Sequence, residues 1–160
     1  MIALDTYILA RAIVREAEPD EVTRRQQEAA QALLASGQDL FLPITVVQEL
    51  EWVLRGVCEL PRDKVLSVIE DLLMIEHLIV DRAGAMAEAV EVYRHGMDFS
   101  DALHLAQSRH CDSMASFDTR FRKLRRVPTL RIGGRFPGIG LETPLPELHG
   151  EEIDPVAFDA

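Results

Sequence analysis

Short apolar segments alternate with longer helical patterns along the chain, and this alternation limits the folds that the chain can adopt. The short segments predict strands over 1–4, 40–42, 77–80, 113–117 and 129–132. Between them, apolar residues at helical spacing predict helices over 6–15, 20–36, 44–55, 61–75, 82–94, 99–110 and 119–126. Strands joined by helices form parallel sheets through right-handed crossovers. We therefore expect an α/β fold with a short parallel sheet flanked by helices.

The chain has enough apolar residues for one domain with a sizeable core, because 48% of its 160 residues are hydrophobic. Residues 133–160 differ from the rest: they hold five of the nine glycines and four of the eight prolines, without a helical period. We expect a domain over 1–132 and an acidic Pro/Gly-rich tail over 133–160.

The sequence also predicts a cytoplasmic protein. Its apolar runs are shorter than the roughly 20 residues that span a membrane, and its N-terminus lacks the pattern of a signal peptide. The two cysteines, Cys58 and Cys111, form no CxxC pair, so neither a zinc site nor a disulfide framework is expected.

Charge is distributed unevenly. The net charge of −10 argues against a nonspecific nucleic-acid coat, but no Lys or Arg follows Arg135, whereas six acids do. Residues 1–136 alone carry 17 basic and 21 acidic residues. A basic cluster precedes the tail: Arg120, Arg122, Lys123, Arg125, Arg126, Arg131 and Arg135. Such a cluster suits a polyanion such as RNA, although it could also be the solvated face of a terminal helix.

Several acids stand where strands end or helices begin. Asp5 follows the first predicted strand and Asp118 the fourth, so their carboxylates meet if these strands are neighbours. Asp98 and Asp101 open a helix, and Glu49 lies within an apolar helical pattern. Crowded carboxylates repel one another unless a cation lies between them. An all-oxygen site suits Mg²⁺ or Mn²⁺, which can activate water and clamp a phosphodiester.

Each acid also has a purely structural interpretation. Asp5 and Asp118 could cap the helices that follow them, and for Asp98 the capping role is preferred. Asp101 could form a capping pair with Asp98, but it lies one turn further into the helix, which favours a functional role. Glu49 could pair with Arg55 or with solvent.

The acid order resembles that of the PIN domain and, within it, of VapC-type toxins of bacterial toxin–antitoxin pairs. Four ordered motifs over residues 1 to about 132 carry the resemblance: Leu4-Asp-Thr-Tyr-Ile-Leu9, Val46-Val-Gln-Glu-Leu-Glu-Trp-Val-Leu54, Asp98-Phe-Ser-Asp-Ala-Leu-His-Leu-Ala106 and Ser116-Phe-Asp-Thr-Arg-Phe121. The family usually has a small polar residue where this chain has Tyr7.

This resemblance implies a metal-dependent endoribonuclease that binds Mg²⁺ or Mn²⁺. It places Asp5, Glu49, Asp101 and Asp118 in the acidic cluster, with Asp98 and Ser116 as possible helpers. Arg120, Arg122 and Lys123 would contact the RNA. It also implies a homodimer and a cognate antitoxin. No membrane partner is expected, because the apolar runs are too short to span a membrane.

Two other functions compete with this one. A phosphatase of the haloacid-dehalogenase type also begins with a strand and an Asp, but it needs a second Asp where this chain has Tyr7. A PIN-like module that binds without catalysis is the alternative from a different class, and the complete set of acids argues against it.

Overall fold

The computed structural model describes residues 1–15, 18–112, 114, 116 and 121. Residues 1–114 form one compact unit, and residues 115–160 form a second one. The first unit contains all the helices and strands that follow. In the second, Ser116 is half-buried and forms an isolated β-bridge, and Phe121 is buried.

A small parallel sheet forms the centre of the first unit. Its strands are β1 (Ile2–Ala3), β2 (Leu40–Leu42) and β3 (Leu78–Val80), in the order β1-β2-β3. Ile2 lies opposite Leu40, which in turn lies opposite Leu78. All three strands therefore run in the same direction and end at the same edge.

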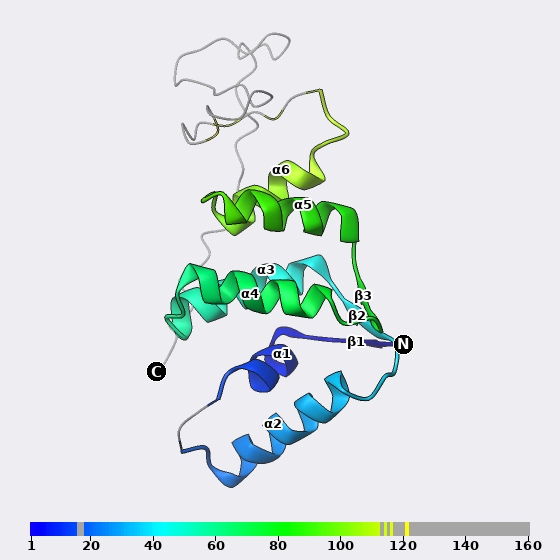
Figure 1. Ribbon diagram of the computed structural model, residues 1–160, viewed down its shortest axis with the longest axis vertical. Helices are drawn as coiled ribbons and strands as arrows, with labels where there is room; N and C mark the ends of the chain where they lie inside the picture. Colours follow the sequence, from blue (N-terminus) through cyan, green and yellow to red (C-terminus); the bar gives the residue numbers. More distant parts are fainter. Residues whose placement is uncertain (16–17, 113, 115, 117–120, 122–160) are drawn as a thin grey trace, which may run out of the picture. The chain divides into compact units, whose positions relative to one another are not determined.

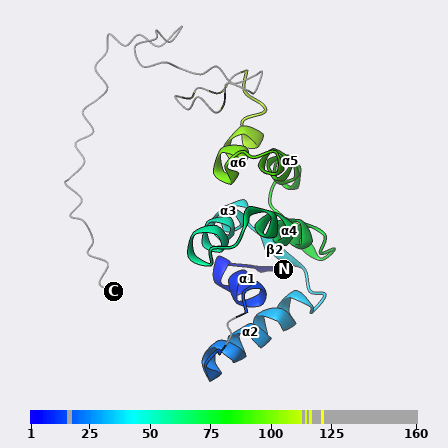
Figure 2. The ribbon, with the colours of Figure 1, turned by 60° about the vertical axis from the view of Figure 1, so that its left-hand side comes forward.

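Helices begin soon after each strand ends. β1 leads into α1 (Thr6–Ile13) and then α2 (Glu21–Leu34). β2 leads into α3 (Ile44–Trp52) and, after a π-helical turn, α4 (Arg62–Leu73). β3 leads into α5 (Ala83–Arg94) and then α6 (Phe99–Gln107). Figures 1 and 2 place α3 and α4 between the α1–α2 pair and the α5–α6 pair.

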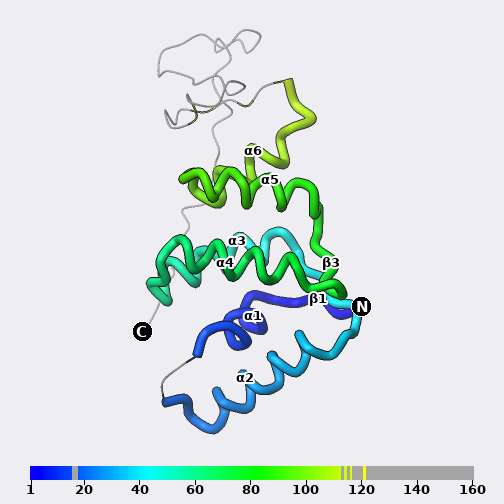
Figure 3. Tube along the Cα trace, in the orientation of Figure 1, coloured from blue at the N-terminus to red at the C-terminus, as the bar shows by residue number. Residues whose placement is uncertain are grey.

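The core lies where these helix pairs meet the sheet. The strands contribute Leu40 and Leu42, which are fully buried, and α3 contributes Val47 and Leu50. The path of the chain in Figure 3 shows why α3 is central, since α1 packs on it from one side and α6 from the other. The predicted fold class, an α/β fold with a short parallel sheet flanked by helices, is confirmed.

The helix boundaries follow the predicted signals closely, with one exception. Gly37 and Gly96 have positive φ angles of 70° and 100°, as expected for glycines that end helices. The helix predicted over 44–55, however, ends at Trp52 and continues as a π-helical turn over Val53–Val57. The wider turn keeps Leu54 fully buried. The elements predicted at 113–117, 119–126 and 129–132 lie almost wholly outside the described residues.

One polar network crosses three helices of the core. Tyr93 on α5 is buried and donates its hydroxyl to Glu51 on α3 at 2.8 Å. The guanidinium of Arg62 lies 3.8 Å from the centre of the Tyr93 ring and donates to the Tyr93 carbonyl at 2.6 Å. The same guanidinium also donates to the carbonyl of Met97. Glu51, which follows Glu49 by two residues, is thus half-buried and ties α3 to α5.

Candidate functional site where two helix starts meet α3

Asp5 lies between β1 and α1 and caps the helix. One of its carboxylate oxygens, Oδ1, accepts a hydrogen bond from the backbone N–H of Ile8 at 3.0 Å. The side chain is exposed. A carboxylate has about four acceptor positions, so the cap occupies only part of its capacity. Capping and ligand binding are therefore compatible at this residue.

Glu49 lies on α3 and accepts a hydrogen bond from the residue that follows Asp5. The donor is the hydroxyl of Thr6, which is only 6% exposed, and the acceptor is Oε2 of the exposed Glu49. Arg55 was a possible partner of Glu49 in the sequence, but in the structure it donates to the carbonyl of Leu60 at 3.0 Å. The contact with Thr6 holds Glu49 near the start of α1.

The residue before Glu49 makes a parallel connection to α6. Gln48 donates from Nε2 to the hydroxyl of Ser100 at 3.0 Å. Ser100 lies in the first turn of α6, between Asp98 and Asp101. Two adjacent residues of α3 are therefore bonded to the neighbours of predicted acids on two other helices.

Asp98 and Asp101 have different environments. Asp98 caps α6, because its Oδ1 accepts from the backbone N–H of Ser100 at 3.0 Å. The capping role preferred for Asp98 is thus confirmed. Asp101 is half-buried in the first turn of the same helix. Its position leaves the functional interpretation open and gives α6 an acid near its N-terminus, where the helix dipole favours negative charge.

The fourth predicted acid and the predicted RNA contacts are not described. Asp118, Arg120, Arg122 and Lys123 lie outside the described residues. Ser116 is described and half-buried. Within the first three motifs, the structure joins Thr6 to Glu49 and Gln48 to Ser100.

A shallow hollow adjoins Glu49 and has a volume of about 430 Å³. Its lining comes from one face of α3 and the start of α6: Thr45, Gln48, Glu49, Trp52 and Ser100. Four of these residues are polar, and Trp52 is the large apolar one, with 63% of its surface exposed. We call this hollow the α3–α6 hollow.

The side chains of the site suit a hard divalent cation in type. Asp5 and Glu49 each present a carboxylate with oxygen positions beyond those that accept from Ile8 and Thr6. Among the described residues, no three acidic, His or Cys side chains are grouped closely enough to hold a metal ion. Mg²⁺ does not require such a group, since it usually keeps several waters and one or two carboxylates. The residues present therefore fit a hydrated Mg²⁺ or Mn²⁺.

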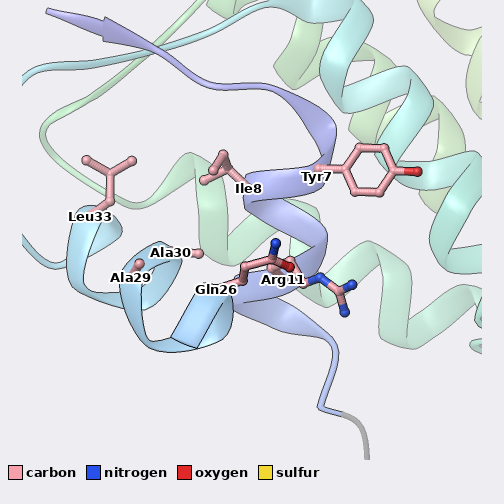
Figure 4. A pocket seen from close by; sticks show the side chains of 7 residues that line it. All are labelled: Tyr7, Ile8, Arg11, Gln26, Ala29, Ala30 and Leu33. Atoms are coloured by element: carbon pink, nitrogen blue, oxygen red, sulfur yellow. The ribbon is translucent and has the colours of Figure 1, made fainter. Parts of the chain in front are cut away.

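A second hollow, of about 420 Å³, separates α1 from α2 (Figure 4). Ala29, Ala30 and Leu33 of α2 make its wall mainly apolar, and Tyr7 contributes from α1. Tyr7 is 76% exposed, so its ring is available at the surface rather than packed in the core.

Sequence reasoning overlooked the residues that connect the acids. Thr6, Gln48 and Ser100 join the three helices, and each is a polar residue directly beside a predicted acid. Trp52, one turn after Glu49, was also missed as a lining residue. A small polar neighbour next to each acid was the available signal, but such residues are too common at helix starts to stand out.

Comparison with known families agrees with the geometry. The family model of the PIN domain matches residues 2–127. Searches among curated proteins and solved structures gave no match. Among the described residues, no helix is both long and apolar enough to cross a membrane. PIN domains are usually nucleases, bind RNA and typically use divalent metal ions.

Proposed function

Since the chain belongs to the PIN domain family, generally a nuclease fold, we propose that it is a metal-dependent endoribonuclease that hydrolyses RNA phosphodiester bonds. We further propose that it is the toxin of a type II toxin–antitoxin pair.

The observation that carries the nuclease proposal is the pair of hydrogen bonds made by Gln48 and Glu49. Glu49 accepts from Thr6, next to Asp5, and Gln48 donates to Ser100, next to Asp101. Three motifs that are far apart in the sequence thus converge on one face of α3. Helix caps alone do not require contacts between these three helices. One cation bound by several carboxylates does require the helices that carry them to lie close together.

In this proposal Asp5, Glu49, Asp101 and Asp118 hold Mg²⁺ or Mn²⁺ through carboxylate oxygens. The bound metal would lower the pKa of a coordinated water and neutralise charge on the phosphate. Thr6 fixes the orientation of Glu49, and Asp98 positions Asp101 by starting the helix. Ser116 would hydrogen-bond a water or the phosphate, while Arg120, Arg122 and Lys123 would contact the RNA backbone.

The test compares cleavage of structured RNA with Mn²⁺ by the wild-type protein and by Asp5→Asn. Asn is as good a helix cap as Asp, so this variant keeps the bond to Ile8 and loses only the charge. Asp20→Asn is the matched control, because Asp20 caps α2 by accepting from Thr23 N–H at 2.7 Å. We expect cleavage to be lost in Asp5→Asn alone; equal cleavage by wild type and Asp5→Asn would refute the proposal.

The toxin role has its own test. Induced expression of the wild-type protein should stop bacterial growth, and expression of Asp5→Asn should not. A small protein encoded next to this chain should restore growth as its antitoxin. Normal growth under wild-type expression would argue for a nuclease outside a toxin–antitoxin pair. Sedimentation of the purified chain tests the homodimer that this role implies.

The catalytically silent alternative predicts a different result. A PIN-like module that serves binding or assembly would not cleave RNA and would give the same result for wild type and Asp5→Asn.

We also propose that the nuclease domain ends near Ile132 and that residues 133–160 are a tail. A chain ended after Gly134 should then retain both its fold and its cleavage activity.

A further inference from the structure

We propose that Trp52 is a stacking surface for a base of single-stranded RNA, placed beside the acids so that it positions the strand. This inference rests on the proposed ribonuclease function and adds a binding residue outside the acidic cluster. It assigns a role to the α3–α6 hollow.

Trp52 has no role in the core that would explain its presence. It is the last residue of α3 and is 63% exposed, whereas its helix neighbours Val47 and Leu50 are buried. Tryptophan is a large apolar side chain that usually contributes much buried area. Here most of that area faces solvent inside a hollow that is otherwise lined by polar residues.

A glycine lies beside the indole of Trp52. The π-helical turn over Val53–Val57 begins directly after it and contains Gly56. A Cβ atom at Gly56 would lie 3.9 Å from both Cε2 and Nε1 of the indole. A side chain at this position would therefore contact the indole, whereas glycine leaves these ring atoms without that contact. π-helical turns occur frequently at functional sites.

The position of the indole relative to the acids suits a strand of RNA. Glu49 and Trp52 are three residues apart on α3, so they are neighbours on one face of the helix. Glu49 in turn contacts Thr6, which follows Asp5. An RNA strand with its phosphate at these carboxylates would bring an adjacent base to Trp52.

Charge favours stacking over ionic contact in this hollow. Of its five lining residues only Glu49 is charged, and a carboxylate repels phosphate. The hollow itself therefore favours the uncharged part of a nucleotide. Thr45 and Gln48 offer hydrogen-bonding groups to a base edge or ribose, and the indole offers an apolar face. Stacking on an aromatic side chain tolerates any base, as a single-strand contact requires.

The first experiment uses the fact that Trp52 is the single tryptophan of the chain. A single-stranded oligouridylate of about ten nucleotides is titrated into the full-length Asp101→Asn protein, where cleavage does not interfere. Anisotropy of a labelled end measures binding, and indole fluorescence reports on Trp52. We expect fluorescence to be quenched in parallel with binding. Binding without any change in fluorescence would overturn the inference.

The second experiment measures cleavage kinetics of Trp52 variants on a short single-stranded RNA. Trp52→Ala should raise KM about 5- to 150-fold with little change in kcat, because stacking contributes equally to the ground and transition states. Trp52→Phe should have a KM much closer to that of the wild-type protein. Val57→Ala is the matched control, since Val57 is 64% exposed in the adjoining turn. An unchanged KM in Trp52→Ala would also overturn the inference.

A base deletion in the RNA separates stacking from other effects. We expect one position where replacing the base by an abasic unit lowers the RNA affinity of the wild-type protein strongly and that of Trp52→Ala only slightly. If Trp52→Ala instead weakens binding at every position equally and converts a dimer to a monomer in sedimentation, Trp52 is a self-association contact and the inference is wrong.

The two proposals fail in different ways. RNA cleavage that depends on Asp5 but not on Trp52 would retain the ribonuclease and reject the stacking surface. Quenching of the indole by RNA, with no cleavage by the wild-type protein in Mn²⁺, would retain the stacking surface and reject the enzyme.

Discussion

Thr6 donates its hydroxyl to the carboxylate of Glu49, although 43 residues separate the two in sequence. Thr6 is almost fully buried, whereas Glu49 is exposed. A buried donor thus fixes one oxygen of an exposed carboxylate and leaves the other for a ligand. The same contact joins the start of α1 to α3. We infer that it orients Glu49 at the proposed site.

Thr6→Val should impair cleavage more than it impairs stability. Valine keeps the shape of threonine but cannot donate, so Glu49 loses its orientation. Loss of such an orienting partner costs about 10- to 100-fold in activity at metal sites. Water can replace the donor at an exposed carboxylate, so the free energy of unfolding should fall by about 1 kcal/mol or less. Thr6→Ser should restore activity; a wild-type rate in Thr6→Val would show that Glu49 needs no orientation.

Substitutions of Asp98 and Asp101 should separate a cap from a ligand. Asp98→Ala should lower the free energy of unfolding by about 1 kcal/mol, because the N–H of Ser100 loses its acceptor, and Asp98→Asn should not. Asp101→Asn should reduce cleavage by about 100-fold or more while the protein stays folded. Urea denaturation and RNA cleavage measured on the same preparations test both. A greater loss of activity in Asp98→Asn than in Asp101→Asn would reverse these roles.

Most of the fold could be predicted because local signals and apolar patterns agree. Asp20 before α2 and Gly96 after α5 mark helix ends through backbone chemistry that needs no tertiary contact. The π-helical turn could not be predicted in this way. This turn depends on burying Leu54 while the chain turns toward α4. Local helix propensity does not depend on such tertiary burial.

The site could be predicted only as a set of residues. Strand ends and motif order predicted Asp5, Glu49, Asp101 and Asp118, but not the contacts that join α1, α3 and α6. In the sequence Glu51 looks like a surface residue beside Glu49, but it is half-buried and accepts a hydrogen bond from Tyr93. Its partner Tyr93 is 42 residues away, and nothing in the local pattern distinguishes Glu51 from an exposed glutamate.

Tyr93→Phe should destabilise the protein without changing the chemistry of the site. The variant removes the hydroxyl that satisfies half-buried Glu51, and a hydrogen bond to a charged group contributes about 1.5 to 3 kcal/mol. The packing of the ring on Phe99, with centroids 5.2 Å apart, should remain. Tyr7→Phe is the control, since Tyr7 is 76% exposed. Equal free energies of unfolding for wild type and Tyr93→Phe would show that water satisfies Glu51 equally well.

The same residue predicts how stability changes in alkali. Burial, followed by the hydrogen bond to Glu51, raises the pKa of Tyr93 well above its ordinary value. The folded state therefore keeps the proton at a pH where the unfolded chain releases it. This contribution is complete below pH about 10, the pKa of an unfolded tyrosine, and falls as the pH rises further. Urea denaturation between pH 9 and about 11 should show a steeper loss for wild type than for Tyr93→Phe; parallel curves would contradict it.

Divalent metal should stabilise the protein through its acids but should not be required for folding. Mn²⁺ at about 100 times its Kd should add about 2.7 kcal/mol, because it binds the folded state alone. For a chain of this size that corresponds to a rise in Tm of roughly 5 to 10 °C. The rise should shrink in Asp5→Asn and Asp101→Asn and persist in Asp20→Asn, whose carboxylate caps α2 outside the site. Excess EDTA should abolish this rise in Tm but leave a cooperative unfolding transition, since the core of the first unit is built from apolar side chains. If Mn²⁺ raised Tm equally in wild type and both site variants, the metal would be bound elsewhere, and the acids at these helix starts would be caps and no more.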